Sequence, residues 1–538
     1  MLVLARRPAP VWLLVVTPIA LLVPLAIVFA RQVSISNGFF NDSLVFFDGI
    51  HRIARGQVPH VDFSTPVGAL GYWLPYLGRE VIGTYAGAIE TASLLLAGVV
   101  VPLTSVMLWR RASSATALLI LGVVAGVLVV PLVPGWNPDE ISHAMQYNRW
   151  GWGLILPLFL LGLPPPEDRP TGIVRGLIGG AFLAALFLIK ITYFVYGSVF
   201  LVLLLACPDA RRRDALVAIV SVVVILAAVL VATGGMIVAY LKDIALALDA
   251  DTAVRDSPLK TIMANRFSVV LVMIAIYAGL LKRNLGWQDL MLVGYICASS
   301  ILILDQNFQF AFLVSLPAAF ALVAAPRGES SETVRVSDSL VIALAYLMVL
   351  PYAPDWARVT LAHLRPPGEE FATVDIDGYG TFYVKDFVPF GAEETAPLSG
   401  TADGEAYMRG DVRVVQLTER QYIDALEEGV DLLRRAGATD GTIFTFDYSN
   451  VMPHLVDAPR ERNAYSWIHL GRNVSRETLV GAEDLLGDVD YVMAPLRSYA
   501  ADLKDLFVEK YGAYILENFE EIDRSESWIL FRKKPASG

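Results

Sequence analysis

Charged side chains are scarce in this sequence. They make up 18% of the 538 residues, whereas a water-soluble domain carries about 25%. The deficit is local, because residues 355–538 carry a net charge of −14 and residues 1–354 a net charge of +3. We therefore predict two domains, an apolar one over residues 1–354 and an acidic, polar one over residues 355–538. The acidic domain would repel phosphates, which excludes nucleic acid as a partner.

Cysteine is also scarce, and several motifs are missing. Cys207 and Cys297 both lie in apolar segments, so no disulfide framework is expected. The acidic domain has neither a glycine-rich phosphate loop nor the ligand spacing of a metal site. The apolar stretch from Val11 to Ala30 is too long for the core of a cleaved signal peptide and lacks a small-residue cleavage site. We expect it to be the first transmembrane helix.

Apolar runs recur through the first domain, and each is a candidate membrane span. We predict about eleven transmembrane helices, at residues 11–31, 85–109, 113–133, 150–164, 175–189, 191–207, 214–233, 267–282, 285–304, 310–326 and 337–353. With a cytoplasmic N-terminus, every cluster of Arg and Lys then falls in a cytoplasmic loop. Merging the two segments beside Lys190 into one helix would break this agreement. We thus predict a polytopic α-helical protein of the cytoplasmic (inner) membrane, with its acidic domain in the periplasm or an equivalent space.

The acidic domain has an α/β pattern and is predicted to be a soluble α/β domain. Residues 419–436 form an amphipathic helical pattern, and residues 442–446 alternate like a strand. A second unit has a strand at 490–493, a helix at 496–511 and a hairpin ending at 528–531. The loops at 446–450 and 459–463 are polar and aromatic, which is typical either of sugar contacts or of ordinary loop packing.

The first predicted outer loop carries the most informative residues. Asp42 follows a membrane exit, and an amphipathic stretch and a turn at residues 56–63 come after it. A carboxylate at the rim of a helical bundle can accept a proton from an incoming hydroxyl nucleophile, so Asp42 is a candidate catalytic base. The alternative is a helix N-cap. His60 and Asp62, in the turn, are candidates for binding substrate or a metal.

Other candidates lie in later loops on the same predicted side. Asp139, Glu140 and His143 could hold a divalent cation such as Mg²⁺ or Mn²⁺, or could cap an interfacial helix.

Lys190 lies between two apolar runs, where it either binds a lipid-linked phosphate, with Tyr193 beside it, or reaches to the lipid headgroups. Asp305 and Asn307, at the end of the ninth span, are candidates for contact with a polar substrate.

The first-loop residues resemble the GT-C superfamily of membrane glycosyltransferases, which includes the protein O-mannosyltransferases and the aminoarabinose transferases. Asp42 matches the family's early acidic residue, and Gly56-Gln57-Val58-Pro59 matches its Gly-Xaa-Xaa-Pro turn. Asp139 and Glu140 match an acidic pair of the second loop, and Lys190 matches a basic residue at the outer end of a middle helix. The resemblance covers residues 10–355, mainly as topology.

This resemblance implies inverting transfer of a sugar from a polyprenyl-phosphate donor to a hydroxyl group of an envelope glycan, lipid or protein. Asp42 would be the general base, and the donor phosphate would lie near Lys190, Tyr193 and Arg149. Ser43 replaces the second carboxylate of the family's usual Asp-Glu pair, which weakens the case for a metal. The Trp-Trp-Asp signature of oligosaccharyltransferases is missing from the acidic domain, which argues against N-linked protein glycosylation.

Two other functions fit the same composition. A transporter or a flippase for a lipid-linked glycan also needs polar groups among its helices, although no similarity between halves of the chain supports it. A scaffold whose soluble domain binds envelope polysaccharide would need no catalytic residue. The sequence specifies neither the sugar nor the acceptor nor the oligomeric state.

Overall fold

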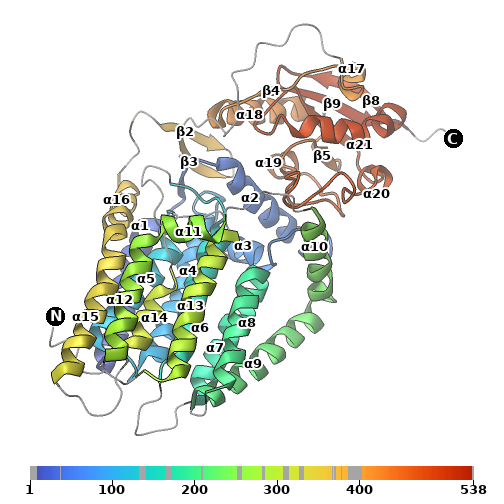
Figure 1. Ribbon diagram of the computed structural model, residues 1–538. Helices are drawn as coiled ribbons and strands as arrows, with labels where there is room; N and C mark the ends of the chain where they lie inside the picture. The colour runs from blue at the N-terminus through green and yellow to red at the C-terminus, as the bar shows by residue number, and fades with distance from the viewer. Residues whose placement is uncertain are drawn as a thin grey trace.

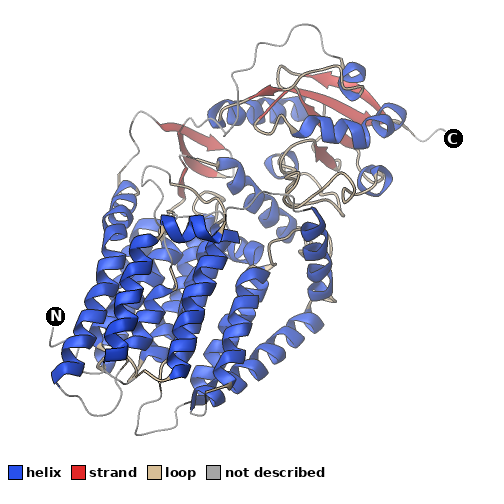
Figure 2. Cartoon of the chain, viewed as in Figure 1, coloured by secondary structure: helices blue, strands red, loops and turns tan. Residues whose placement is uncertain are grey.

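The computed structural model describes residues 9–36, 38–132, 141–164, 172–207, 210–250, 257–281, 285–306, 314–325, 332–365, 368, 371–376, 379–385 and 403–535. Helices between residues 11 and 362 form a bundle, and residues 403–535, which we call the C-terminal part, lie at one end of it (Figure 1). Figure 2 shows that the described strands gather at this same end.

The bundle consists of α1 Val11–Phe29, α3 Leu70–Ile82, α4 Ala88–Leu108, α5 Ser114–Val129, α6 Gln146–Phe159, α7 Gly172–Ile189, α8 Ile191–Leu205, α9 Ala210–Ala232, α10 Met236–Ala250, α11 Pro258–Ala264, α12 Arg266–Leu281, α13 Trp287–Gln306, α14 Leu316–Val323, α15 Glu332–Val349 and α16 Ala353–Ala362.

Among the described residues, five helical segments are long and apolar enough to cross a membrane, and α11 with α12, bent by 82°, would make a sixth. The surface of α9 is apolar, with Val231 83% exposed, which is stable in lipid but not in water. The chain is therefore an integral membrane protein, and the count of about eleven spans stays a prediction.

The chain breaks between two helices at Lys190, as the distribution of positive charge predicts. Helix α7 ends at Ile189, and α8 begins at Ile191. Lys190 between them has an extended backbone, with φ −162° and ψ 124°. The prediction of two separate helices at this point is confirmed.

In the described part of the chain, three sheets join distant segments. In the first, β1 Val33–Ser36 pairs in parallel with β3 Gly380–Lys385, which pairs antiparallel with β2 Phe371–Ile376. The second pairs β4 Val415–Gln416 with β7 Arg497–Ser498. The third has the strand order β5-β6-β9-β8, with β5 Ile443–Thr445, β6 Tyr491–Pro495, β8 Phe519–Arg524 and β9 Trp528–Lys533. The first sheet ties the segment after α1 to the segment after α16.

The C-terminal part follows its sequence pattern, with one correction. Helix α18, Glu419–Arg435, begins with a capping box between Thr418 and Gln421 and confirms the predicted helix. The short helices α17 Gly404–Met408, α19 Met452–Leu455 and α20 Ala482–Leu486 complete the part. The helix predicted at 496–511 is wrong in its position, because α21 spans Leu503–Asn518. Its predicted start instead forms β7, which pairs with β4.

The predicted domain boundary falls within a continuous helical segment. A 3₁₀ turn, Leu350–Tyr352, joins α15 to α16, so helical structure continues to Ala362. The division into residues 1–354 and 355–538 stays a prediction.

Candidate active site

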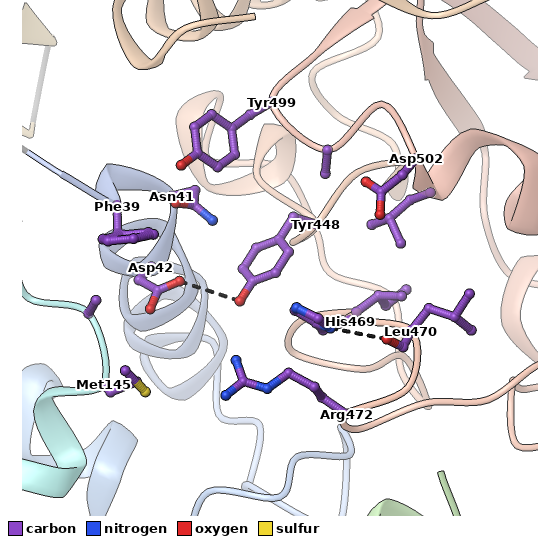
Figure 3. Close-up of a pocket in the computed structure, with 14 residues that line it drawn as sticks. Phe39, Asn41, Asp42, Met145, Tyr448, His469, Leu470, Arg472, Tyr499 and Asp502 are labelled. Atoms are coloured by element: carbon purple, nitrogen blue, oxygen red, sulfur yellow. Dashed lines mark hydrogen bonds between the residues drawn. The ribbon is translucent and has the colours of Figure 1, made fainter. Parts of the chain in front are cut away.

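A cavity of about 290 Å³ opens where the C-terminal part meets the helix α2, Phe40–Ala54 (Figure 3). Fourteen residues line it: Phe39, Asn41, Asp42, Ala144, Met145, Tyr448, Ile468, His469, Leu470, Arg472, Tyr499, Ala500, Asp502 and Leu503. Residues of the first and second predicted outer loops thus form one wall, and loops of the C-terminal part form the other.

Helix α2 places Asp42 at this cavity. Phe39, the residue before the helix, has a left-handed backbone with φ 61°, so the chain turns sharply before α2 begins. The backbone N–H of Phe40 donates to the Glu419 carboxylate at 2.7 Å. A carboxylate from α18 therefore caps the N-terminus of α2, and Asp42 in its first turn does not. The alternative in which Asp42 is the N-cap is wrong.

The Asp42 carboxyl is partly buried and is contacted from the C-terminal part. The Tyr448 hydroxyl donates a hydrogen bond to Asp42 Oδ1 at 3.3 Å (Figure 3). Burial raises the pKa of Asp42 to about 6, although the Tyr448 hydrogen bond and the positive charge of Arg472 both oppose that increase. A base with a pKa close to neutrality is ionised at pH 7 and still takes up a proton readily. The site therefore suits general base catalysis.

Tyr448, His469 and Arg472 line the far wall of the cavity, and Trp467, which is not in the lining, packs beside Tyr448. The ring of Tyr448 lies 5.8 Å from that of Trp467 and 6.5 Å from that of His469, measured between centroids. Burial and the charge of Arg472 lower the pKa of His469, so its ring is neutral at pH 7. Aromatic faces beside hydrogen-bonding groups suit a sugar ring, which has both apolar C–H and polar O–H surfaces.

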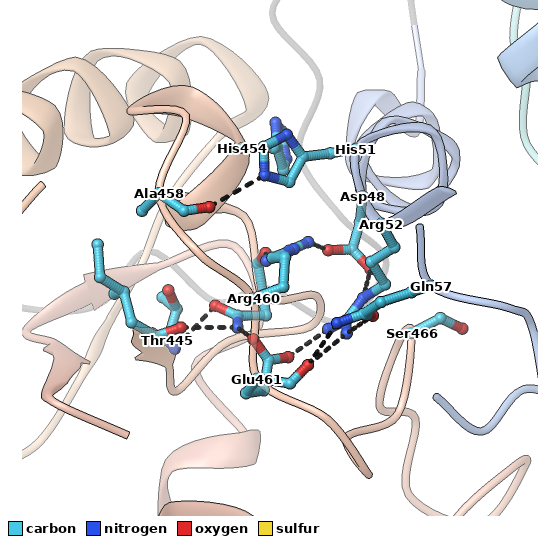
Figure 4. Close-up of polar contacts among 12 residues, drawn as sticks. Asp48, His51, Arg52, Gln57, Thr445, His454, Ala458, Arg460, Glu461 and Ser466 are labelled. Carbon is cyan, nitrogen blue, oxygen red and sulfur yellow. Dashed lines mark hydrogen bonds and ion pairs between the residues drawn. The ribbon is translucent and has the colours of Figure 1, made fainter. Parts of the chain in front are cut away.

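A buried ionic network fixes the C-terminal part on α2 (Figure 4). Arg52, fully buried on α2, donates through Nε to Asp48 Oδ2 at 2.8 Å and also bonds to the Glu461 carboxylate. Arg460 forms an ion pair with Asp48, and Asn450 donates to Glu461 Oε2 at 2.6 Å. Each buried charge in the network has an opposite charge beside it. The network therefore fixes the position of the C-terminal part relative to α2.

The other candidates in the first loop make structural contacts. His60 Nδ1 lies 2.8 Å from Asp243 Oδ2, and the His60 ring lies 4.5 Å from that of Tyr240 on α10. Asp62 Oδ2 accepts from the backbone N–H of Val58 at 2.7 Å, which closes the turn. Neither His60 nor Asp62 lines the cavity of Asp42.

The predicted phosphate-binding residues lie together around α6. Lys190 Nζ donates to Asn148 Oδ1 at 3.0 Å and lies 5.1 Å from the centre of the Tyr147 ring. Tyr193 is buried, and its hydroxyl donates to the Asn148 carbonyl at 3.1 Å. The structure brings these residues close to one another but not into the lining of the cavity.

Arg149, the third of these candidates, is 1% exposed and donates to the Ser142 carbonyl at 2.9 Å and to Gln146. It is absent from the lining of the cavity.

Of the remaining candidates, His143 and Asp305 are absent from the lining of this cavity. His143 Nε2 is 2.9 Å from Glu90 Oε1, and Asp305 accepts from Thr261 at 3.4 Å. Asp139, Glu140 and Asn307 lie outside the described residues. Within the described ranges, no group of three or more His, Cys, Asp or Glu side chains could hold a metal ion.

Sequence reasoning missed Arg472, which extends into the cavity (Figure 3). It had included Tyr448 only within a loop of undecided role. A signal for Arg472 was available in the run Trp467-Ile-His-Leu-Gly-Arg472, in which an aromatic residue, a histidine and a cation surround a glycine turn. Gly471 in that turn has φ +76°.

Comparison with known proteins gives structural matches alone. No protein-family model matches the sequence, and no curated protein matches it. A solved structure of ArnT from Cupriavidus metallidurans bound to undecaprenyl phosphate matches with a TM-score of 0.48 and 10% identity, over 97% of this chain and 98% of that one. The oligosaccharyltransferase AglB from Archaeoglobus fulgidus, in complex with an inhibitory peptide and a dolichol-phosphate, matches with a TM-score of 0.42 and 10% identity, over 97% and 75%.

Proposed function

We propose that this protein is an inverting membrane glycosyltransferase that moves a sugar from a polyprenyl-phosphate donor to a hydroxyl group of an envelope glycan, lipid or protein. One observation carries the proposal: Asp42, a partly buried carboxylate with a pKa raised to about 6, lines a cavity at the end of an apolar helical bundle. A lipid-linked donor needs an apolar surface for its chain and a polar pocket for its sugar. The apolar bundle would supply the first, and the cavity of Asp42 would supply the second.

In the proposed reaction, the acceptor hydroxyl takes the place of the Tyr448 hydroxyl at Asp42. Asp42 accepts the hydroxyl proton while the acceptor oxygen attacks the anomeric carbon of the donor sugar. The bond from that carbon to the phosphate oxygen breaks, and its electron pair leaves with the polyprenyl phosphate. Attack on the face opposite the leaving phosphate inverts the anomeric configuration.

The donor phosphate is proposed to lie on the side of Lys190. The Tyr147 ring, which Lys190 contacts, packs against the same apolar cluster, Val45, Phe63, Val67 and Tyr72, as Tyr448. Lys190 through Tyr147, and Asp42 through Tyr448, are therefore linked to one cluster. Arg149 and Tyr193 would support Lys190 through Asn148 and its neighbours on α6. A divalent cation, Mg²⁺ or Mn²⁺, is not needed for this arrangement, because Asp42 and Lys190 supply the base and the positive charge.

The same proposal includes a topology. About eleven helices span the inner membrane, the N-terminus is cytoplasmic, and a soluble α/β domain over residues 355–538 lies on the periplasmic side together with the cavity. Labelling of single-cysteine variants at exposed sites, such as Asp440→Cys in the C-terminal part, with a membrane-impermeant reagent tests this directly. Protection of the introduced thiol in intact cells, with labelling only after lysis, would contradict it.

Transfer can be tested with the full chain in lipid nanodiscs, a panel of polyprenyl-phosphate monosaccharides labelled in the sugar, and an envelope extract as acceptor. The wild type should transfer label to acceptor, and Asp42→Asn should lose about 10²–10⁴-fold, which is the usual contribution of a general base. Asp440→Asn, at an exposed turn far along the chain, is the matched control and should transfer normally. Wild-type turnover by Asp42→Asn in this assay would refute the proposal, as would movement of donor across the bilayer of proteoliposomes without transfer.

A further inference from the structure

A second, smaller cavity of about 70 Å³ lies beside the ends of α1 and α16. Its lining includes Phe29, Arg31, Glu90, His363 and Arg365. Two of the membrane-spanning candidates, Val11–Phe29 and Asp338–Ala362, end just before Arg31 and His363. The Arg31 guanidinium donates to the His363 carbonyl at 2.7 Å, so the two ends lie at the same level. This level is where the hydrocarbon of a bilayer gives way to lipid headgroups.

Two arginines supply positive charge at this cavity. Arg31 and Arg365 are far apart in the sequence, and both line the cavity. The planar guanidinium group binds phosphate oxygens in pairs and is the usual partner for phosphate in proteins. These two side chains alone would suit any phosphate-bearing headgroup.

A buried histidine adds a requirement for a hydrogen-bond donor. His363 is 7% exposed, and its Nδ1 donates to the Val359 carbonyl at 2.8 Å. Because a carbonyl only accepts, Nδ1 carries the proton and Nε2 presents a lone pair. Burial lowers the pKa of His363 to about 4, which keeps the ring neutral at pH 7. Its Nε2 is buried and has no hydrogen-bond partner among the described residues. A ligand that donates an N–H would satisfy it.

Glu90 places negative charge at the same cavity. It is 2% exposed, and its Oε1 accepts from Ser34 Oγ at 2.7 Å and lies 2.9 Å from His143 Nε2. A simple anion would be repelled by Glu90, and a simple cation would be repelled by Arg31 and Arg365. A zwitterion that carries a phosphate and a primary ammonium satisfies both ends.

We propose that this cavity binds the headgroup of an ethanolamine phospholipid, with its phosphate on Arg31 and Arg365 and its ammonium N–H groups on His363 Nε2 and Glu90. The trimethylated ammonium of a choline lipid has no N–H and cannot make the second contact. A glycerol headgroup has a phosphate but no positive charge for Glu90. The site is separate from the cavity of Asp42 and does not depend on the proposed function.

Native mass spectrometry of the full chain in detergent can test this site with phosphatidylethanolamine, phosphatidylcholine and phosphatidylglycerol of identical acyl chains. We expect about tenfold tighter binding of the ethanolamine lipid than of either other lipid. His363→Phe keeps a ring against Phe29, whose centroid lies 4.8 Å away, and should lower ethanolamine binding to the choline level while leaving glycerol binding unchanged. The double change Arg31→Gln with Arg365→Gln should weaken binding of all three lipids.

Arg358→Gln, an exposed change on α16, is the matched control and should bind all three lipids like the wild type. The single change Arg365→Gln alters an exposed side chain, so it gives a folded test if His363→Phe does not fold. Equal binding of the ethanolamine and choline lipids by the wild type would overturn the proposal, as would an unchanged preference in His363→Phe. Free phosphoethanolamine at millimolar concentration should not displace the lipid, and displacement would assign the site to a soluble ligand instead.

Discussion

Replacing Asp42 by asparagine should make the protein more stable while it makes it inactive. Asn has the shape of the carboxylic acid, keeps an oxygen that can accept from Tyr448, and carries no charge. Burial holds the pKa of Asp42 at about 6, whereas the ordinary value is 3.8. The folded state thus binds this proton more tightly than the unfolded state does, and wild-type stability falls as the pH rises from 3.8 to 6.

The size of the effect follows from that difference. At 1.36 kcal/mol for each pH unit, the ionised carboxylate costs the folded protein about 3 kcal/mol above pH 6 and nothing below about pH 4. The Asp42→Asn variant avoids this cost at every pH. Its stability advantage should therefore be near zero at pH 4 and about 3 kcal/mol at pH 7.5. Such a trade between stability and activity is expected where a fold keeps a charge buried for chemistry.

Thermal unfolding in one detergent, followed by intrinsic fluorescence at pH 4 and pH 7.5, measures this difference directly. Comparing variant with wild type at each pH cancels the titration of all other groups. Asp440→Asn, which removes an exposed carboxylate, should unfold like the wild type at both values. If Asp42→Asn has the same advantage at both pH values, or is the less stable protein at pH 7.5, the carboxyl is not held in the buried, proton-retaining environment described above.

Three further outcomes are expected. Transfer activity should rise from pH 5 to 7 with a midpoint of about 6, and a midpoint near 4 would contradict this. Because Tyr448 and Arg472 both lower the pKa of Asp42, Tyr448→Phe or Arg472→Gln should move the midpoint upward. Arg472→Lys keeps the positive charge and should move the midpoint less. Glu461→Gln should destabilise the protein by about 3–5 kcal/mol, because Arg52 stays buried without that negative charge. Asp457→Asn, at a side chain that is 85% exposed, should change stability little. Equal unfolding temperatures for the two variants would argue against the network. Gly87→Ala should prevent normal folding, because Gly87 has φ +81° and an added Cβ would overlap the Arg31 carbonyl oxygen. The yield of monodisperse protein after purification measures this. Gly98→Ala, whose added Cβ would have nothing within 4 Å, should purify normally.

Local patterns in the sequence predicted much of the fold. The amphipathic stretch after Asp42 is α2, the turn at Gly56 has φ +81°, and the helices on either side of Lys190 are separate. Helical periodicity and caps act within a few residues, so they can be read locally. The helix predicted at 496–511 failed for the opposite reason, because β7 forms through pairing with residues about 80 positions earlier.

The candidate site shows the same limit. The sequence indicated Asp42, which lines the cavity, since an acidic residue soon after a membrane exit is a local feature. It did not indicate Arg472 or the contact of Tyr448 with Asp42, because these depend on loops about 400 residues away. The grouping of Lys190, Arg149 and Tyr193 as a phosphate site stays a prediction. Lys190 and Tyr193 both bond to Asn148 on α6, a contact that periodicity alone could not reveal.

The two walls of the cavity of Asp42 are synthesised at very different times. Helix α2, with its buried Asp48 and Arg52, leaves the ribosome long before Arg460 and Glu461 exist to neutralise it. Until then, these charges have only each other and water, and the cap that Glu419 gives to α2 is missing as well. A chain that stops before residue 460 would therefore carry Asp42 on an unsupported helix with no pocket around it. The cavity around Asp42 therefore forms only after the C-terminal part has been synthesised and has packed on α2.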